Sequence, residues 1–547
     1  MRRSKDLTFF AVAVFALAAL TAVSNAQQQT STTAEKTAFG GEVDVTVVNV
    51  EVYVRDDEGR PVEGLTIDDF RISQDGEERP ISNFAARSRE NLVNPAPIQA
   101  GSQQPASPRP HIRPVFVVIH VDNANLIPRD RYRVLTRMVS FVEEALVPPV
   151  QMMVVSSLQT LEVRQGFTSD PEAVIAALKR ASADSGARVP REAERRRIMD
   201  GMEEFSTDPR SFEPLFFENP MTRIVVVQTQ QDILAFAEQE GAVLKDTLDN
   251  LHQVVGLMSG MGGRRAVLYV SSGLPMTPGL GLVHEFARVF HDQTIYSRVA
   301  QRDFTSEFRT MADAANKTGV GLYTIDGSGL NPLEGFGAED RYVPEAAASW
   351  ASISNLQESL KYMADTTGAI AVTGTNDVLA GLRLIGDDLF SYYSLGYAIV
   401  PRGEGTQHKI EVELPGHPDL DVRHREWFVE RSPESYIQDR MLSLLVQDFE
   451  DNALGLRLAF GEPEFGDKRR WEVPLHVSCP ARNLTLARVD DDYVGQVELF
   501  LGARDARGRQ TKPERMKYTV RIPAALYDPT PELRYGITIR LKVREQQ

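Results

Sequence analysis

The chain has 547 residues, with 60 lysines and arginines against 76 aspartates and glutamates, a net charge of −16 and one cysteine. This length exceeds what a single hydrophobic core supports, so several domains are expected. The acidic excess argues against nonspecific nucleic-acid binding, which needs Lys and Arg to displace phosphate counterions. The single Cys479 excludes an intrachain disulfide and a cysteine-rich metal site.

Residues 1–26 have the composition of an export signal. A basic start at Arg2 and Arg3 precedes the apolar run Phe9–Val23, and Ala26 ends a group of small residues suited to signal peptidase. The run is short for a membrane span, and no later stretch is long and apolar enough to be one. We therefore expect an exported protein in the periplasm, in the medium or on the cell surface. An N-terminal anchor that stays attached is the alternative.

The next segments predict a flexible tail, a small β region and a linker. Residues 27–40 are polar and form the expected tail. Residues 41–86 contain the alternating, valine-rich run Val43–Val54 and further short strands, which is typical of a β-sandwich. This region is too short for a core of its own and needs strands from elsewhere. Residues 87–112 are rich in Pro, Gln and Ser and predict a linker.

Residues 113–389 alternate between apolar strands and amphipathic helices. Val115–Val121 is apolar except for His120, as expected of a strand covered on both faces. Further buried strands are predicted at Met152–Val155, Leu161–Phe167, Arg265–Ser271 and Gly321–Asp326. Such alternation predicts a doubly wound, mostly parallel α/β sheet with helices on both faces.

Residues 183–263 interrupt this alternation as a helical insertion. Arg191–Arg197 is highly charged and predicts a solvated helix. A long amphipathic helix follows, with an apolar face made of Ile233, Phe236, Ala237, Leu244, Leu248, Leu251, Val255 and Met258. We expect this face to pack on the α/β domain, because apolar faces are usually buried within their own chain. A surface for a partner or for a second copy is the alternative.

The chain then returns to β structure. Residues 390–431 contain three predicted strands, and Ser432 and Pro433 mark a boundary. Residues 433–547 begin with a short helix and continue with several strands, which is enough for a second β-sandwich. Cys479 lies in one of these strands and is expected to be a small buried apolar residue.

Four segments together carry a resemblance to a known family: Val52–Phe84, Arg264–Leu274 (RRAVLYVSSGL), Ala314–Leu330 and Leu360–Val429. They resemble the bacterial VWFA-related proteins, abundant in acidobacteria, which carry a von Willebrand factor type A domain. The resemblance implies a type A domain inserted in an Ig-like β-sandwich, whose two parts are residues 41–86 and 390–431. Separate small domains are the alternative.

The resemblance also implies a metal site at the carboxyl ends of the central strands. Type A domains hold a divalent cation there with an Asp-x-Ser-x-Ser loop, a Thr and a second Asp. Asp122 fits the first position of this motif. Ala124 and Leu126 stand where the serines belong, Ser272 stands where the second Asp belongs, and no Thr can be placed.

Four residues are therefore the candidate metal ligands of a degenerate site: Asp122, Asn123, Asn125 and Ser272. Asp326 also follows a strand and is a further candidate. The ion would be Mg²⁺ or Mn²⁺, held weakly because ligand number and charge govern affinity. Alternatively, Asp122 and Asn125 only make hydrogen bonds to the backbone of their loop.

No sequence motif indicates catalysis. The chain lacks a Gly-x-Ser-x-Gly elbow and a phosphate-binding loop, and His284 and His291 are seven apart, where a zinc protease needs four. We therefore predict no enzyme, no certain cofactor and an exported, non-enzymatic protein that binds a protein partner. A metal-dependent adhesin and a hydrolase with a site invisible in sequence are the alternatives. The oligomeric state is left open.

Overall fold

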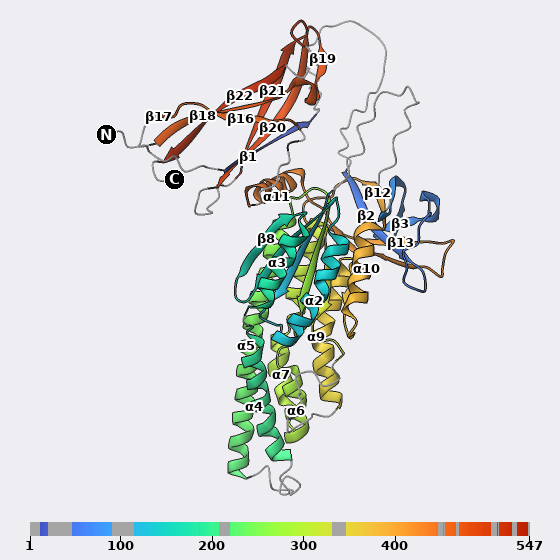
Figure 1. The fold of residues 1–547 in the computed structure, drawn as a ribbon, viewed down its shortest axis with the longest axis vertical. Coiled ribbons are helices and arrows are strands. Elements are labelled where there is room, and N and C mark those ends of the chain that lie inside the picture. The colour runs from blue at the N-terminus through green and yellow to red at the C-terminus, as the bar shows by residue number, and fades with distance from the viewer. Residues whose placement is uncertain are drawn as a thin grey trace, which may run out of the picture. The chain divides into compact units, whose positions relative to one another are not determined.

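The computed structural model describes residues 11–19, 46–89, 114–184, 186–206, 219–330, 346–446, 452, 454–465, 470–504, 511, 513–527 and 533–544. The chain divides into two compact units (Figure 1). One comprises residues 43–432, and the other comprises residues 433–547 together with residues 1–42.

The larger unit contains a six-stranded sheet with the order β11-β10-β9-β6-β7-β8. Its parallel strands are β6 (Val115–Asp122), β7 (Val150–Ser157), β9 (Arg264–Ser271), β10 (Val320–Asp326) and β11 (Ala371–Val372). Every residue of β6 is buried, as its uninterrupted apolar sequence predicts for a central strand. The α/β architecture expected from the sequence is thus present.

One predicted strand differs from expectation. Leu161–Phe167 is predicted as a buried strand of the parallel sheet, but β8 (Leu161–Thr168) runs antiparallel to β7 at the sheet edge, and none of its residues is fully buried. The connection from Ser157 to Leu161 is too short for the crossover that parallel strands need, so a hairpin is the only possible pairing.

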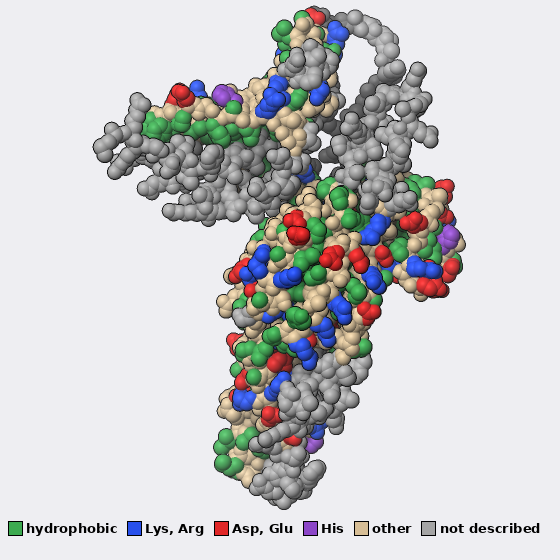
Figure 2. Space-filling view, viewed as in Figure 1, with side chains coloured by type: hydrophobic (Ala, Val, Ile, Leu, Met, Phe, Trp, Pro, Cys, Tyr) green, Lys and Arg blue, Asp and Glu red, His purple; other side chains and the backbone are tan. Residues whose placement is uncertain are grey.

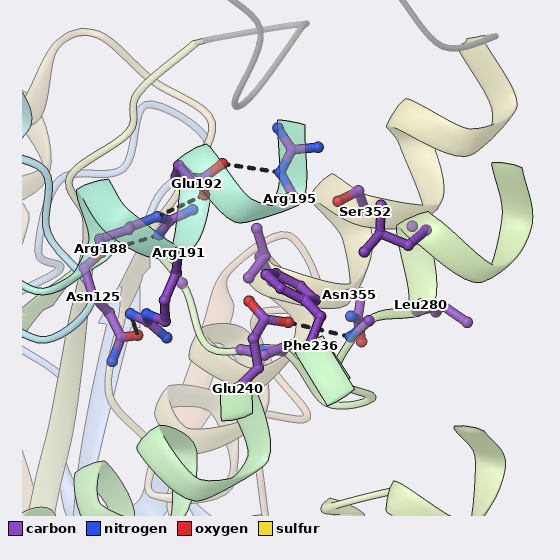
Figure 3. Close-up of a pocket in the computed structure, with 16 residues that line it drawn as sticks. Asn125, Arg188, Arg191, Glu192, Arg195, Phe236, Glu240, Leu280, Ser352 and Asn355 are labelled. Atoms are coloured by element: carbon purple, nitrogen blue, oxygen red, sulfur yellow. Dashed lines mark hydrogen bonds and ion pairs between the residues drawn. The ribbon is translucent and has the colours of Figure 1, made fainter. Parts of the chain in front are cut away.

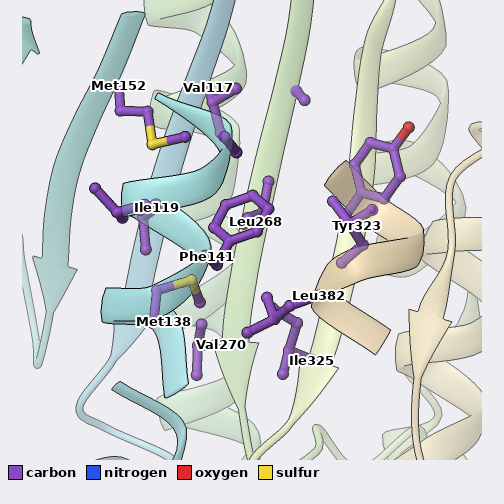
Figure 4. Close-up of a cluster of buried hydrophobic side chains, with 14 of the residues drawn as sticks. Val117, Ile119, Met138, Phe141, Met152, Leu268, Val270, Tyr323, Ile325 and Leu382 are labelled. Atoms are coloured by element: carbon purple, nitrogen blue, oxygen red, sulfur yellow. The ribbon is translucent and has the colours of Figure 1, made fainter. Parts of the chain in front are cut away.

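Helices cover the sheet on both faces. They are α2 (Pro128–Ala145), α3 (Pro171–Ser182), α8 (Thr305–Thr318), α9 (Ala346–Thr366) and α10 (Val378–Phe390). Met138 and Phe141 of α2 and Leu382 of α10 pack against alternate residues of the central strands in one hydrophobic core (Figure 4). Helices α8 and α9, which come later in the chain than α2 and α3, contact β10.

A helical arm extends from the carboxyl side of the sheet. We use this name for α4 (Arg188–Ser206), the first part of α5 (Pro220–Met258), α6 (Leu280–Phe290) and α7 (Thr294–Val299). All eight residues of the predicted apolar face of α5 are buried. However, Ile233 and Phe236 pack against Met202 and Phe286 of the other arm helices, not against the sheet. The arm therefore has a core of its own (Figure 1).

Two further sheets of this unit combine strands from before and after the α/β region. They contain β2 (Thr46–Arg55), β3 (Arg71–Gln74), β4 (Glu77–Arg79), β5 (Ile81–Arg87), β12 (Tyr392–Ile399), β13 (Gln407–Glu413), β14 (Asp421–His424) and β15 (Trp427–Val429). Strand β12 pairs with both β2 and β5, and β13 pairs with β3. Side chains of both sheets share one core, in which Val50 and Leu395 are fully buried.

A buried carboxylate joins these sheets to the α/β domain. Asp388 of α10 accepts hydrogen bonds from Arg55 of β2 at 2.7 Å and from Arg423 of β14 at 2.5 Å. Tyr323 of β10 donates a third at 3.2 Å. Arg264 of β9 donates to the same tyrosine at 3.0 Å and to the main-chain carbonyl of Asp388. The two parts are therefore fixed to each other by buried charged hydrogen bonds.

The smaller unit consists of α11 (Pro433–Val446) and two sheets that share a core. The strands are β1 (Ala11–Ala19), β16 (Arg457–Phe460), β17 (Glu464–Phe465), β18 (Arg470–Pro480), β19 (Ala487–Val489), β20 (Asp492–Arg504), β21 (Glu514–Pro523) and β22 (Arg534–Arg544). Cys479 is buried in that core.

Strand β1 belongs to the predicted export signal. It pairs antiparallel with β20, from Ala11 opposite Arg504 to Ala19 opposite Gln496. This pairing belongs to the uncleaved chain, so cleavage after Ala26 stays a prediction. Within the described ranges, no helix is both long and apolar enough to cross a membrane.

Asp388 generates a stability prediction. We expect Asp388→Ala to lower the free energy of unfolding by about 3–5 kcal/mol, because it leaves buried arginines without their shared carboxylate. The adjacent Asp387 is exposed, so Asp387→Ala is the matched control and should change stability by less than about 1 kcal/mol. Urea titration followed by circular dichroism measures both. Equal losses in the two variants would contradict the role assigned to Asp388.

Candidate functional site

Three parallel strands end in polar residues at one edge of the central sheet. Strand β6 ends at Asp122, β9 at Ser271 and β10 at Asp326, and Asp326 lies opposite Ser271 in the strand register. All three side chains are buried. The carboxyl ends of parallel strands are the usual place for a ligand crevice in an open α/β sheet. We call this region the strand-end crevice.

The carboxylate of Asp122 is saturated with hydrogen bonds. Its Oδ1 accepts from the backbone N–H groups of Ala124 at 3.1 Å and Asn125 at 3.2 Å. Its Oδ2 accepts from the Asn125 amide at 2.8 Å, the Tyr269 hydroxyl at 2.5 Å and the Ser271 hydroxyl at 3.0 Å. Since a carboxylate offers about four lone-pair positions, these five donors leave none for another ligand.

Tyr269 remains a hydrogen-bond donor in this arrangement. Burial, reinforced by the negative charge of Asp122, raises the pKa of the Tyr269 hydroxyl well above its usual value. The hydroxyl therefore keeps its proton and points it at Asp122. In a cation site the same carboxylate oxygen would be directed at the ion.

The other predicted ligands do not converge. Asn123 points elsewhere, since its amide donates to Asp184 at 3.1 Å and its carbonyl accepts from Arg131 at 2.9 Å. The amide nitrogen of Asn125 donates to Asp122, as stated above, and to Thr247 at 3.1 Å. Of the four predicted ligands, Asp122 and Asn125 are the two whose side chains hydrogen-bond to each other in the described structure.

Two more residues with oxygen side chains lie at the crevice. The Ser272 hydroxyl is buried and has no hydrogen-bond partner in the described structure. Asp326 accepts from the backbone and hydroxyl of Ser328 at 2.8 and 2.5 Å and from Gln357 at 3.0 Å. The carboxylate of Asp326 is thus also committed to its own loop and to α9.

Two arginines of helix α4 cover the crevice. One N–H group of Arg188 is 3.0 Å from the carbonyl oxygens of both Asn125 and Ser272. Arg191 donates to the carbonyl of Ala124 and, at 2.9 Å, to the side-chain oxygen of Asn125. Figure 3 shows Arg191 pointing toward Asn125, with Arg188 beside it.

These arginines were missed in the sequence. The charged stretch Arg191–Arg197 is predicted as a solvated helix, and Arg188 lies just before it, but Arg188 and Arg191 are only 9% and 7% exposed. A signal was available, because Arg188, Arg191 and Arg195 follow a spacing of three and four residues and so share one helix face. The insertion follows the candidate metal-binding loop in the chain. Three arginines on one face of its first helix could therefore have indicated a contact with that loop.

A small cavity of about 50 Å³ adjoins the arginines. Its charged lining residues are Arg188, Arg191, Arg195, Glu192 and Glu240. Burial alone would raise the pKa of Glu192, but the positive charges of Arg195 and Arg188 lower it to about 2. Burial raises the pKa of Glu240, against the opposing effect of Arg191. The cavity therefore combines a firmly ionised carboxylate with a second one that is more easily protonated.

The residues present do not fit a divalent cation. Mg²⁺ requires about six oxygen ligands, but the oxygens of Asp122 and Asn125 already accept hydrogen bonds and two guanidinium groups lie beside them. Among the residues that the structure describes, no group of three or more His, Cys, Asp or Glu could hold a metal ion. The sequence-based ligand set of Asp122, Asn123, Asn125 and Ser272 is thus not assembled as one cage.

Comparisons with known proteins give remote likenesses. No protein-family model and no curated protein matches the chain. The von Willebrand factor domain of the type V pilus tip protein Mfa5 from Porphyromonas gingivalis is 13% identical, and the match covers 50% of this chain and 94% of that one with a TM-score of 0.26. A von Willebrand factor type A protein from Catenulispora acidiphila is 9% identical, covering 82% and 75%, with a TM-score of 0.24.

A third solved structure, the conserved hypothetical protein BatB from Bacteroides thetaiotaomicron, is 13% identical, covering 50% of this chain and 97% of that one, with a TM-score of 0.23. These structure neighbours include proteins with von Willebrand factor type A domains.

The saturated carboxylate generates a metal prediction. We expect the melting temperature of the protein to be the same in millimolar Mg²⁺, in millimolar Mn²⁺ and in EDTA. A ligand that binds only the folded state stabilises it by about 2.7 kcal/mol at a hundred times its dissociation constant, so a site with a dissociation constant of about 10 μM would be visible in about 1 mM ion. Differential scanning calorimetry is the measurement, and a melting temperature that rises with either ion would contradict the prediction.

Glu192 generates a pH prediction. Because its pKa is lowered from 4.5 to about 2, its ionised form stabilises the fold above pH 4.5, and this contribution is lost as the pH falls through about 2. The pH-dependent part amounts to at most about 3 kcal/mol. Glu192→Gln should therefore show a flatter fall in stability between these pH values than the wild type.

The matched control for Glu192 is Glu194, a half-buried residue on the same helix whose hydrogen bonds to Arg197 also lower its pKa. Glu194→Gln should change the dependence of unfolding free energy on pH much less than Glu192→Gln does, because solvent screens this pair. Chemical unfolding at a series of acidic pH values measures all three proteins. A Glu192→Gln curve parallel to the wild type would show that the buried carboxylate has an ordinary pKa.

Proposed function

We propose that this chain is an exported, non-enzymatic interaction protein of the adhesion type, in which a type A-like α/β domain contacts a protein partner. The observation that carries this proposal is the closed strand-end crevice. Its carboxylates are held by hydrogen bonds within the chain, and Arg188 and Arg191 cover its loops. A substrate or a partner's carboxylate would have to displace these contacts, so we place the partner on the outer surface of the arm.

The far end of the helical arm offers a suitable surface. Met221, Ile224 and Val227 of α5 are 70%, 62% and 52% exposed, whereas Thr222 and Gln230 of the same helix are buried. Their spacing of three residues places the apolar side chains in one stripe. Figure 2 shows hydrophobic side chains at this end of the arm. Exposed apolar groups of this kind are typical of protein interaction sites.

The two alternative functions, a metal-dependent adhesin and a hydrolase, require arrangements that differ from those of the described residues. A metal-dependent adhesin needs oxygen ligands that face an ion, but Asp122 faces five hydrogen-bond donors. A hydrolase needs a nucleophile within reach of a base. At the crevice, His120 contacts Ser157 at 2.8 Å, and both side chains are fully or almost fully buried. Water and substrate therefore do not reach this pair.

The arm surface generates a binding prediction. With the exported chain immobilised and exposed to cell-envelope extract of its source organism, we expect a retained protein partner. The triple variant Met221→Ser, Ile224→Ser, Val227→Ser should bind that partner about tenfold more weakly or worse, because apolar anchors at interfaces contribute roughly 1 kcal/mol or more each. Surface plasmon resonance with the identified partner measures the affinities.

The matched control replaces three exposed apolar residues elsewhere on the α/β domain. Tyr132, Leu158 and Val163 are 67%, 41% and 56% exposed, and their replacement by Ser should leave both the affinity and the melting temperature unchanged. Equal binding by the arm variant and the control would place the partner on another surface. Turnover of a substrate by the purified chain would contradict the non-enzymatic proposal as a whole.

A further inference from the structure

We infer that the guanidinium of Arg191, with that of Arg188 beside it, takes the place at the strand ends where domains of the resembling type hold a divalent cation. The inference goes beyond the proposed function, since it concerns what closes the crevice and not what the arm binds. It starts from the disagreement between the candidate ligands and a metal ion.

The two arginines contact oxygen atoms at the strand ends, and most of these are main-chain carbonyls. Together they reach the carbonyl oxygens of Ala124, Asn125 and Ser272 and the side-chain oxygen of Asn125. These oxygens come from the loop after β6 and from the residue after β9, so the guanidinium groups join the two segments that carry the candidate ligands Asp122, Asn125 and Ser272. A guanidinium satisfies several acceptors in fixed directions because it carries five N–H donors.

The charge balance also favours this assignment. Asp122 is fully buried, and its direct hydrogen-bond donors are neutral: two backbone N–H groups, an amide and two hydroxyls. A buried carboxylate without a compensating charge is strongly destabilising. The charge of Arg191 interacts most strongly with Glu240 and also with Asp122. A divalent cation at the same place would be repelled by it.

Ala124 and Leu126, which stand where the motif has serines, also help to close the strand-end crevice. Ala124 and Leu126 are 2% and 0% exposed, and Leu126 belongs to the main hydrophobic core of the sheet. The loop is therefore held by apolar packing on one side and by guanidinium groups on the other. Because both arginines lie on the insertion, the same contacts anchor the base of the helical arm to the strand ends.

Chemical rescue tests the inference. Arg191→Ala and Arg188→Ala should each lower the melting temperature of the full chain by several degrees. Millimolar guanidinium chloride should restore part of the loss in Arg191→Ala, relative to sodium chloride of equal ionic strength, because the ion can enter the vacated space. Mg²⁺ and Mn²⁺ should not restore it. Arg197→Ala is the matched control, since Arg197 lies on the same helix and, within the described ranges, hydrogen-bonds to Glu194 and Asp232 and not to the crevice.

Two results would overturn the inference. One is a recovery of Arg191→Ala that is larger with Mg²⁺ or Mn²⁺ than with guanidinium, which would reveal a metal site. The other is an Arg191→Ala protein as stable as Arg197→Ala. If the variants do not fold, electron paramagnetic resonance of Mn²⁺ added to the wild-type chain decides the matter. A tightly bound Mn²⁺ that Asp122→Asn abolishes would contradict us, and its absence is the expected result.

Discussion

The buried carboxylate of Asp122 is the constraint on which the crevice depends. It lies at the end of the central strand, where no water can solvate it, so the chain must supply both its hydrogen bonds and a compensating positive charge. Neutral donors from β9 and from the loop after β6 provide the hydrogen bonds. Arg191 on the inserted helix α4 contributes positive charge, which it shares between Asp122 and Glu240. The position of the insertion is thus tied to the position of one carboxylate.

The opposite end of the sheet uses the same chemistry. Strand β9 begins at Arg264, which contacts α10 and the two tyrosines Tyr53 and Tyr323. Asp388 forms ion pairs with Arg55 and Arg423 of the flanking β sheets. Segments added to the α/β domain are therefore attached at both ends of its strands by buried guanidinium groups. Such attachments are directional, because each N–H group must point at a particular oxygen.

Much of the fold could be predicted from local patterns. The uniform apolar run of β6 predicts a strand covered on both faces, and the spacing from Ile233 to Met258 predicts the buried face of α5. Strand β8 was assigned the wrong environment, because apolar runs do not reveal pairing direction and the short connection to β7 was not weighed. Helices α6 and α7 join the arm core through contacts distant in sequence, which no local periodicity contains.

The candidate site was only partly predictable for a related reason. A motif comparison identifies positions such as Asp122 and Ser272, and it shows which oxygen ligands are missing. It does not show which group replaces them, since Arg188 and Arg191 lie in an insertion that has no counterpart in the motif. Their buried contacts with Asn125 and Ala124 become visible only when α4 is placed in space.

The charges at the crevice can nevertheless be balanced residue by residue. A divalent cation with two aspartates would bring two positive and two negative charges to the strand ends. Here Arg188, Arg191 and Arg195 supply three positive charges, and Asp122, Asp326 and Glu192 supply three negative ones. Glu240 is held closer to its neutral form by burial, which raises its pKa. An aspartate at Ser272 in addition to these groups would leave an excess negative charge in a buried place. The neutral serine at position 272 therefore fits the charge balance that the arginines of α4 set. These arginines supply the positive charge that a cation would otherwise supply.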